Sequence, residues 1–198
     1  MSDAPRPTGG ARGARAGGSA PSLQARALRL LAQREHSRLE LERKLQRFIA
    51  RPDADPTEST DPVATASAVP RYSAQDLSDA LDALQAKGFI QPERVAQSIL
   101  HRRAPKLGSQ RVLQELRQKG LDEDLIRNAA ATLRSSEHAR AWAVWQRKFG
   151  QAATTPQERA KHMRFLASRG FAAEVVGKVV RGQAPEPGDE AEDDASLA

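Results

Sequence analysis

Apolar residues recur at intervals of three and four along each stretch of this chain that could contribute to a core. Leu41, Leu45 and Phe48 show this spacing, and so do Leu81 and Leu84. No such stretch alternates apolar and polar residues in the manner of a half-buried strand. The pattern therefore predicts an all-α protein. The expected helices span residues 22–34, 37–49, 73–87, 92–104, 109–119, 122–133, 137–149, 155–169 and 172–180.

Capping residues mark the predicted helix ends. Ser37 and Glu40 form a Ser-x-x-Glu capping box, and Thr155 stands before Pro156 and Glu158 in the same arrangement. Four helices are expected to end at a glycine, because glycine adopts the left-handed conformation that closes a helix at little cost. These residues are Gly88, Gly120, Gly170 and Gly182.

Two of these endings share a longer pattern. Residues 116–126 and 166–176 both read Leu-x-x-(Lys/Arg)-Gly-(Leu/Phe)-x-x-acidic-apolar-apolar. Residues 84–89 repeat only the first six positions, which the chemistry of a helix end alone could explain. Recurring endings among the expected helices predict three tandem three-helix repeats, at residues 22–90, 91–134 and 135–182.

Several large apolar side chains are expected in the core. Leu28 is placed on the inward face of the first helix. Trp142, Trp145 and Phe149 recur at three and four positions, which favours a core stripe over stacking on nucleic-acid bases. The phenylalanines expected to pack around helix ends are Phe89, Phe165 and Phe171.

Charge is distributed unevenly between the repeats and three segments without helical periodicity. These segments are predicted to be disordered: a basic arm at 1–21, a Pro-rich acidic insertion at 51–72 and an acidic tail at 183–198. The formal charge of +6 divides into +2 for the arm, −2 for the insertion, −6 for the tail and +12 for the remainder. A folded part this basic favours a polyanionic partner, and the acidic tail can compete with that partner for the basic surface.

The sequence offers little for catalysis. It holds no cysteine, which excludes disulfides and thiol chemistry and favours a reducing compartment such as the cytoplasm. No apolar run approaches the roughly 18 residues of a membrane span. The four histidines lack metal-ligand spacing and are expected at the surface, and no Gly-rich phosphate loop follows a strand. We therefore expect no enzymatic activity, no metal and no cofactor.

Basic residues are the candidates for binding, because Lys and Arg contact phosphate groups. One group surrounds the junction of the fourth and fifth expected helices and continues along the fifth: Arg102, Arg103, Lys106, Arg111, Arg117 and Lys119. The other group lies in the third repeat: Arg147, Lys148, Arg159, Lys161, Arg164 and Arg169. An ordinary solvated helix face is the alternative explanation for both groups.

Short motifs follow one another in a fixed order along residues 25–182, apart from the insertion. They are Ala27-Leu28-x-x-Leu31 with Arg34, Ser37, Glu40-Leu41 and Lys44-Leu45; Gly88-Phe89-Ile90 with Glu93-Arg94 and Ala96; Arg111 to Gly120; and Phe165-Leu166-x-x-Arg169-Gly170-Phe171. In this order they resemble the RecX family of regulatory proteins. Val95 departs from the usual phenylalanine, Gln91-Pro92 replaces the usual acidic pair, and the insertion is longer than is typical.

The resemblance implies an elongated, curved stack of three-helix repeats. It also implies binding to the RecA recombinase filament on single-stranded DNA and inhibition of RecA ATPase, strand exchange and filament extension. Such a protein modulates recombinational DNA repair and the SOS response. Under this hypothesis it acts as a monomer in the cytoplasm, with RecA and single-stranded DNA as its partners.

Two other classes of function remain open from the residues alone. One is a DNA-binding transcription regulator of helix-turn-helix type without RecA contact. Its recognition helix would be residues 109–119, which present Gln110, Arg111, Gln114 and Gln118. The other is a helical scaffold that binds a protein without nucleic acid, which the charge of +12 disfavours.

Overall fold

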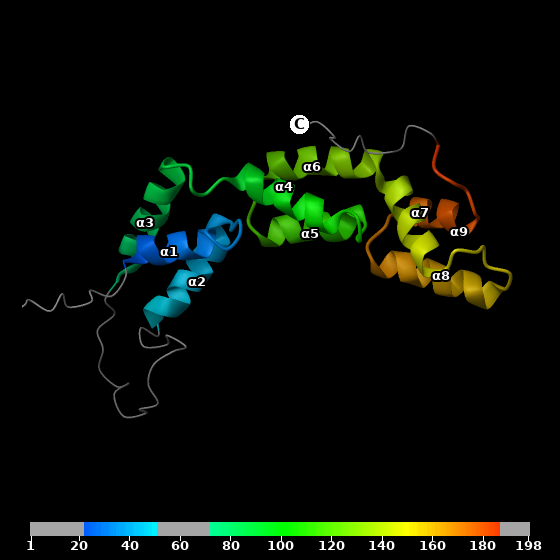
Figure 1. Ribbon diagram of the computed structural model, residues 1–198, viewed down its shortest axis with the longest axis horizontal. Coiled ribbons are helices and arrows are strands. Elements are labelled where there is room, and N and C mark those ends of the chain that lie inside the picture. Colours follow the sequence, from blue (N-terminus) through cyan, green and yellow to red (C-terminus); the bar gives the residue numbers. More distant parts are fainter. Residues whose placement is uncertain (1–21, 51–71, 187–198) are drawn as a thin grey trace, which may run out of the picture.

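The computed structural model describes residues 22–50 and 72–186. Within these ranges the chain forms nine α-helices and no strand, which confirms the predicted all-α class (Figure 1). The helices are α1 (Leu23–Leu31), α2 (Arg38–Ala50), α3 (Ala74–Ala86), α4 (Pro92–Arg103), α5 (Ser109–Gln118), α6 (Glu123–Ser135), α7 (Glu137–Lys148), α8 (Pro156–Ser168) and α9 (Ala173–Val180).

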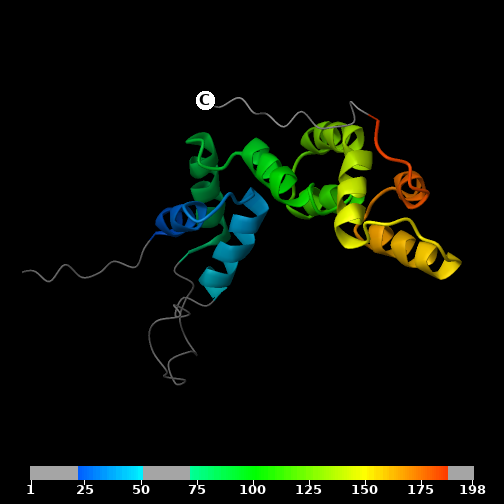
Figure 2. The ribbon, with the colours of Figure 1, turned by 45° about the vertical axis from the view of Figure 1, so that its right-hand side comes forward.

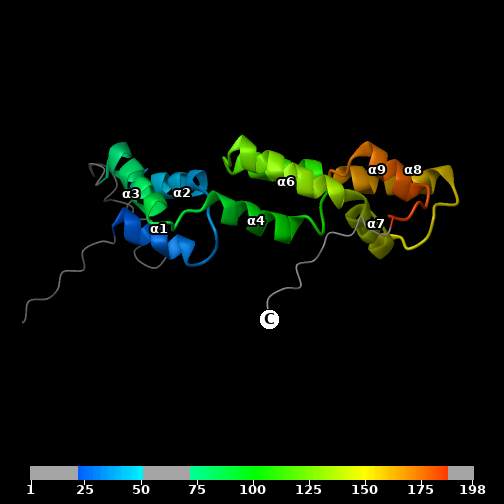
Figure 3. The ribbon, with the colours of Figure 1, turned by 90° about the horizontal axis from the view of Figure 1, so that it is seen from above.

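The helices pack in consecutive groups of three, and each group has its own apolar core. Leu41 and Leu81 are buried in the first core, Val112 and Leu116 in the second, and Leu166 in the third. The three groups lie in a row, so the protein is an elongated array of three-helix repeats (Figures 1, 2 and 3). Since each repeat has its own core, the contacts between neighbouring repeats determine how the repeats are arranged relative to one another.

The predicted capping boxes are present. The Ser37 hydroxyl accepts from the Glu40 amide at 3.2 Å, while the Glu40 carboxylate accepts from the Ser37 amide at 3.3 Å. Thr155 and Glu158 make the same reciprocal pair at the start of α8. Each pair satisfies amides that a helix start leaves without an intrahelical partner.

The repeated helix endings have a common geometry. Gly120 and Gly170 both have positive φ, +70° and +81°, as the glycine pattern predicts. Gly88 also has positive φ, +73°, but the buried residue that follows it comes one position later than in the other two endings. Ile90 is buried, whereas Phe89 is 47% exposed, so the prediction that Phe89 packs at a helix end is wrong.

Other apolar predictions have mixed outcomes. Trp145 and Phe171 are buried in the third core, and Trp142, Phe149 and Phe165 pack against it. The core interpretation of the tryptophans is therefore confirmed. Leu28, by contrast, is 36% exposed, because α1 presents Leu23 and Ala27 to the first core and turns Leu28 outward.

The predicted disordered arm, most of the insertion and most of the acidic tail lie outside the described residues. Tyr72, at the end of the predicted insertion, packs against the first core. The first residues after α9 are described, and there the Gln183 carbonyl oxygen lies 3.0 Å from Nε2 of His138 in α7. No helix in the described part of the chain is long and apolar enough to cross a membrane.

Candidate nucleic-acid interface

A pocket of about 490 Å³ opens where the second repeat meets the third. Its lining combines apolar side chains with four cationic ones, of which one belongs to the first basic group and three belong to the second. None of the described residues that line it is acidic. The lining residues are Lys106, Leu107, Val144, Arg147, Lys148, Phe165, Ser168 and Arg169.

Direct backbone contact places Lys106 beside the third repeat. The Gly108 amide donates to the Arg169 carbonyl oxygen at 2.9 Å, and the Gln110 amide donates to the Gly170 carbonyl oxygen at 3.2 Å. A Cβ atom on residue 108 would lie 2.1 Å from the Phe171 nitrogen. Only glycine allows so close an approach, and this approach brings the loop after α4 against the end of α8.

A buried carboxylate strengthens the same joint. Glu137, at the start of α7, is 4% exposed. One of its oxygens, Oε1, accepts from the Ser109 amide at 2.9 Å and from the Ala172 amide at 3.3 Å. Both amides stand at helix starts, where the positive end of the helix dipole favours a negative charge. Glu137 thus ties α5 of the second repeat to α9 of the third.

Arg140, which also lies in α7, binds the loop between α4 and α5 at the same joint. Its guanidinium donates to the carbonyl oxygens of Leu107 at 2.7 Å, Leu133 at 2.8 Å and Ala104 at 2.9 Å. Burial lowers the pKa of Arg140 from its ordinary value, and the nearby Glu137 charge opposes that shift. The guanidinium therefore fixes the loop between α4 and α5, which carries one edge of the pocket.

The pocket cations contact uncharged groups. Arg147 donates to the Pro105 carbonyl oxygen at 3.3 Å, and the Arg169 guanidinium lies 3.9 Å from the centre of the Phe165 ring. Lys106 and Lys148 are exposed. Since a carbonyl or a ring does not neutralise a positive charge, these side chains remain available to an anion. Apolar and cationic side chains together suit a chain of phosphates that carries bases.

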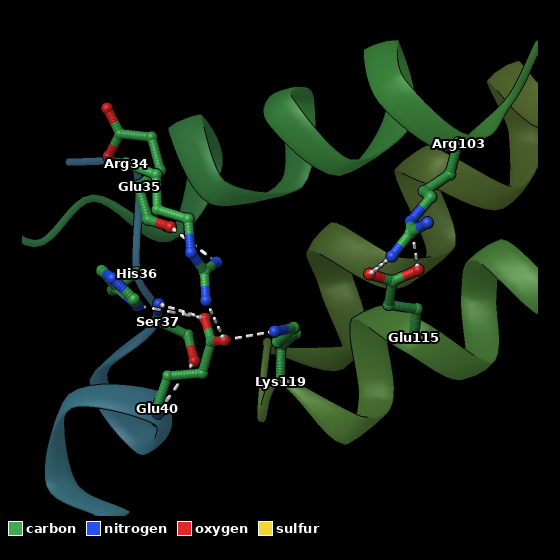
Figure 4. Close-up of polar contacts among 8 residues, drawn as sticks. All are labelled: Arg34, Glu35, His36, Ser37, Glu40, Arg103, Glu115 and Lys119. Atoms are coloured by element: carbon green, nitrogen blue, oxygen red, sulfur yellow. Dashed lines mark hydrogen bonds and ion pairs between the residues drawn. The ribbon is translucent and has the colours of Figure 1, made fainter. Parts of the chain in front are cut away.

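The other candidate residues do not line the pocket. Arg103 pairs with Glu115 at 2.9 Å and Arg117 with Glu123 at 3.8 Å, and Lys119 forms an ion pair with Glu40 (Figure 4). Two more donate to backbone oxygens, Arg102 to Ser98 and Arg111 to Ser168. The remaining three are exposed on α8: Arg159, Lys161 and Arg164.

Charged side chains connect the first repeat to the second. The Glu40 carboxylate binds both Arg34, at 3.1 Å, and Lys119 (Figure 4), and Glu35 pairs with Arg94 at 2.6 Å. Burial alone would raise the pKa of Glu40, but hydrogen bonds from Lys119, the Ser37 amide and Arg34 together lower it to about 2. This joint therefore depends on ion pairs, whereas the joint beside the pocket combines backbone contact with buried hydrogen bonds of Glu137 and Arg140.

Two histidines are buried, contrary to the expectation that all four lie at the surface. His36 is 1% exposed, and neither ring nitrogen has a hydrogen-bond partner among the described residues. Burial, with the positive charges of Arg34 and Lys44, lowers its pKa to about 4. His162 is 6% exposed, and its Nδ1 accepts from Trp145 Nε1 at 3.2 Å. Both therefore serve as uncharged packing residues.

Three residues that shape the pocket were missed in the sequence. Gly108 lies between two predicted helices, and the pattern over 137–149 marks Glu137 and Arg140 only as members of a helix. A glycine directly before a helix start is a weak signal of close backbone approach. Nothing local in the sequence indicates the partners of Glu137 or Arg140, because those partners lie on other helices.

Comparisons with known proteins identify the family. Residues 93–129 match the model of the RecX second three-helix domain, and residues 136–180 match that of the third. The chain is also 40% identical over 161 residues to the regulatory protein RecX of Ralstonia nicotianae, an overlap of 81% of this chain and 87% of that protein. The chain belongs to the RecX family.

Other RecX proteins agree in sequence and fold. The regulatory protein RecX of Leptothrix cholodnii is 41% identical over 160 residues, which cover 81% of this chain and 88% of that one. The crystal structure of RecX from Lactobacillus salivarius has a TM-score of 0.59 at 14% identity, covering 81% of this chain and 94% of that one. A second structure, of regulatory protein RecX, has a TM-score of 0.56 at 18% identity and covers 79% and 72%. The likeness extends over most of the RecX array.

Proposed function

We propose that this RecX-family protein binds the RecA filament on single-stranded DNA and inhibits RecA ATPase, strand exchange and filament extension. It would thereby modulate recombinational DNA repair and the SOS response. The observation that carries the proposal is the pocket between the second and third repeats, because its cations Lys106, Arg147, Lys148 and Arg169 are matched to a polyanion. Membership of a regulatory family supports the inhibitory role.

The proposed action needs binding and no chemistry. Cations on a rigid joint hold phosphates at fixed spacing, and the elongated array can extend along a filament rather than cap a single site. We propose that the protein works as a monomer in the cytoplasm, without a cofactor and without catalytic activity of its own. The filament then loses activity because a bound array opposes the changes that nucleotide turnover and extension require.

A sequence-reading role for α5 has less support. Helix-turn-helix proteins contact base edges with the N-terminal residues of the recognition helix. In this protein Ser109 is buried, and a Cβ atom on Gly170 would lie 2.5 Å from Cγ of Arg111. The third repeat therefore occupies the end of α5 that would enter a major groove.

DNA-dependent ATP hydrolysis by RecA of the same organism tests the proposal. Substoichiometric protein should depress the rate, and the variant Lys106→Ala, Arg147→Ala, Lys148→Ala should depress it much less. A matched control, Arg43→Ala, Arg47→Ala, Lys87→Ala, removes three exposed cations from the first repeat and should inhibit like the unaltered protein. An unaltered ATPase rate at every ratio of protein to RecA would refute the proposal.

A further inference from the structure

The acidic segment after α9 begins beside the helix that supplies two of the pocket cations. Residues 183–198 hold six carboxylates and no Lys or Arg, and the carboxylates lie between Glu186 and Asp194. The segment starts beside α7, where the Gln183 carbonyl oxygen lies 3.0 Å from His138 Nε2. The same helix supplies Arg147 and Lys148 to the pocket. One helix therefore links the start of the segment to the pocket cations.

The segment is long enough to reach these cations. From His138 to Arg147 the path along α7 is about 14 Å at 1.5 Å per residue, plus up to half a turn around a helix about 10–12 Å wide. An extended chain advances about 3.3 Å per residue, so the stretch from Gln183 to Asp189 can span up to about 20 Å and the stretch to Asp194 up to about 36 Å. The carboxylates from Asp189 to Asp194 can therefore meet the pocket of their own molecule.

Charge favours the pocket over those basic residues of the described part that already have an acidic partner. Lys119, Arg103 and Arg94 already pair with carboxylates of the first two repeats. The pocket cations contact only carbonyl oxygens or a ring where they have partners at all, and no carboxylate lies among the lining residues. Attachment to the same chain also gives the acidic segment an effective concentration in the millimolar range.

We propose that the acidic residues between Glu186 and Asp194 fold back onto the pocket between the second and third repeats and compete there with a polyanionic partner. The docking of the acidic segment is inferred from the pocket and the segment alone. The identity of the polyanionic partner rests on the proposed function. An internal competitor of this kind weakens the binding of polyanions to the pocket. It also makes that binding more selective, because only a partner with many closely spaced charges displaces the acidic segment.

Zero-length carbodiimide cross-linking of the full chain tests the docking. It joins a carboxylate to a lysine amine in contact with it, and the expected product links the peptide 182–198 to Lys106 or Lys148 within one molecule. Lys106→Arg with Lys148→Arg keeps the charge but removes the reactive amines, so this variant should lose the product. Products that join only two copies, only Lys161 or only Lys178 would overturn the docking, as would the absence of any product.

Competition is tested with fluorescein-labelled oligothymidylate. Replacing Asp189, Glu190, Glu192, Asp193 and Asp194 by their amides should tighten binding about five-fold, and unlabelled oligothymidylate should suppress the cross-link. Equal affinity of both proteins, with no cross-link, overturns the inference and leaves the proposed function standing. A pocket cross-link that neither oligothymidylate nor RecA filament displaces overturns the competition and the proposed function but confirms the docking.

Discussion

The Gly108 amide donates to the Arg169 carbonyl oxygen across 2.9 Å, so the backbones of the second and third repeats touch. A methyl group on residue 108 has no room, because the neighbouring atoms belong to the backbone of Gly170 and Phe171. We expect Gly108→Ala to reduce the free energy of unfolding by about 2 kcal/mol or more, in the range of overpacked sites. Urea unfolding measures the loss.

Gly177 provides the matched control for that substitution. It lies within α9, and a Cβ atom there would meet only the flexible end of the Arg181 side chain, at 3.2 Å. Gly177→Ala should therefore stabilise the protein by up to about 1 kcal/mol, as expected in a helix interior. Equal effects of the two substitutions would contradict the close contact at Gly108.

Removal of the Glu137 carboxylate leaves two helix starts without their acceptor. Glu137→Ala should cost about 3 kcal/mol of unfolding free energy, because the Ser109 and Ala172 amides lose a charged partner in a buried place. Glu137→Gln keeps an acceptor oxygen and should cost about 1 kcal/mol. If chemical denaturation gives both variants the same stability as the unaltered protein, Glu137 does not hold the joint.

His36 makes the protein sensitive to mild acid. Its pKa is about 4 in the folded chain against 6.5 for the free side chain, so the unfolded chain takes up the proton first. The stability that neutral His36 contributes is complete above pH 6.5 and is lost as pH falls toward 4. Between about pH 7.5 and pH 5 the loss should be about 2 kcal/mol.

His36→Leu checks this pH dependence, because Leu107 stands two residues before the second helix of the next repeat, as His36 does in the first. The variant should lose less stability than the unaltered protein on acidification, as measured by unfolding at both pH values. Burial also lowers the pKa of His162. The variant should therefore keep a smaller dependence of stability on pH. Identical pH profiles of the two proteins would show that His36 does not titrate in this window.

Salt dependence reports on the pocket cations. Each phosphate contact on a single strand contributes about 0.7 to the slope of log affinity against log salt concentration. Arg147→Ala with Lys148→Ala should therefore flatten the slope for oligothymidylate by about 1.4. The pair Arg43→Ala with Arg47→Ala, on exposed positions of α2, should leave it unchanged. Similar slopes for both pairs would place the interface elsewhere.

The helices could be predicted from the sequence because their signals are local. The Ser37 and Thr155 caps, and the glycines after Leu116 and Leu166, each determine a start or an end within a few residues. Phe89 shows the limit of such reasoning. Its motif matches those of Leu121 and Phe171, but after α3 the residue buried in the first core is Ile90 instead. A one-residue shift does not alter the local pattern.

The pocket could be predicted only in part. Lys106 and Arg169 were both candidates, but they belonged to separate groups, since nothing local in the sequence indicates that the Gly108 and Arg169 backbones touch. The ion pair between Lys119 and Glu40 was missed for the same reason. Long-range pairings of this kind depend on how repeats dock, and helix periodicity carries no information about docking.

Trp142 and Trp145 are the two tryptophans of the sequence, and both lie in α7. Intrinsic fluorescence of the full chain therefore originates almost entirely at one end of the molecule. Far-ultraviolet circular dichroism, by contrast, averages over every helix. Two melting curves recorded on one sample thus compare the third repeat with the whole array, and a separation of their midpoints would show that the third repeat does not unfold together with the rest.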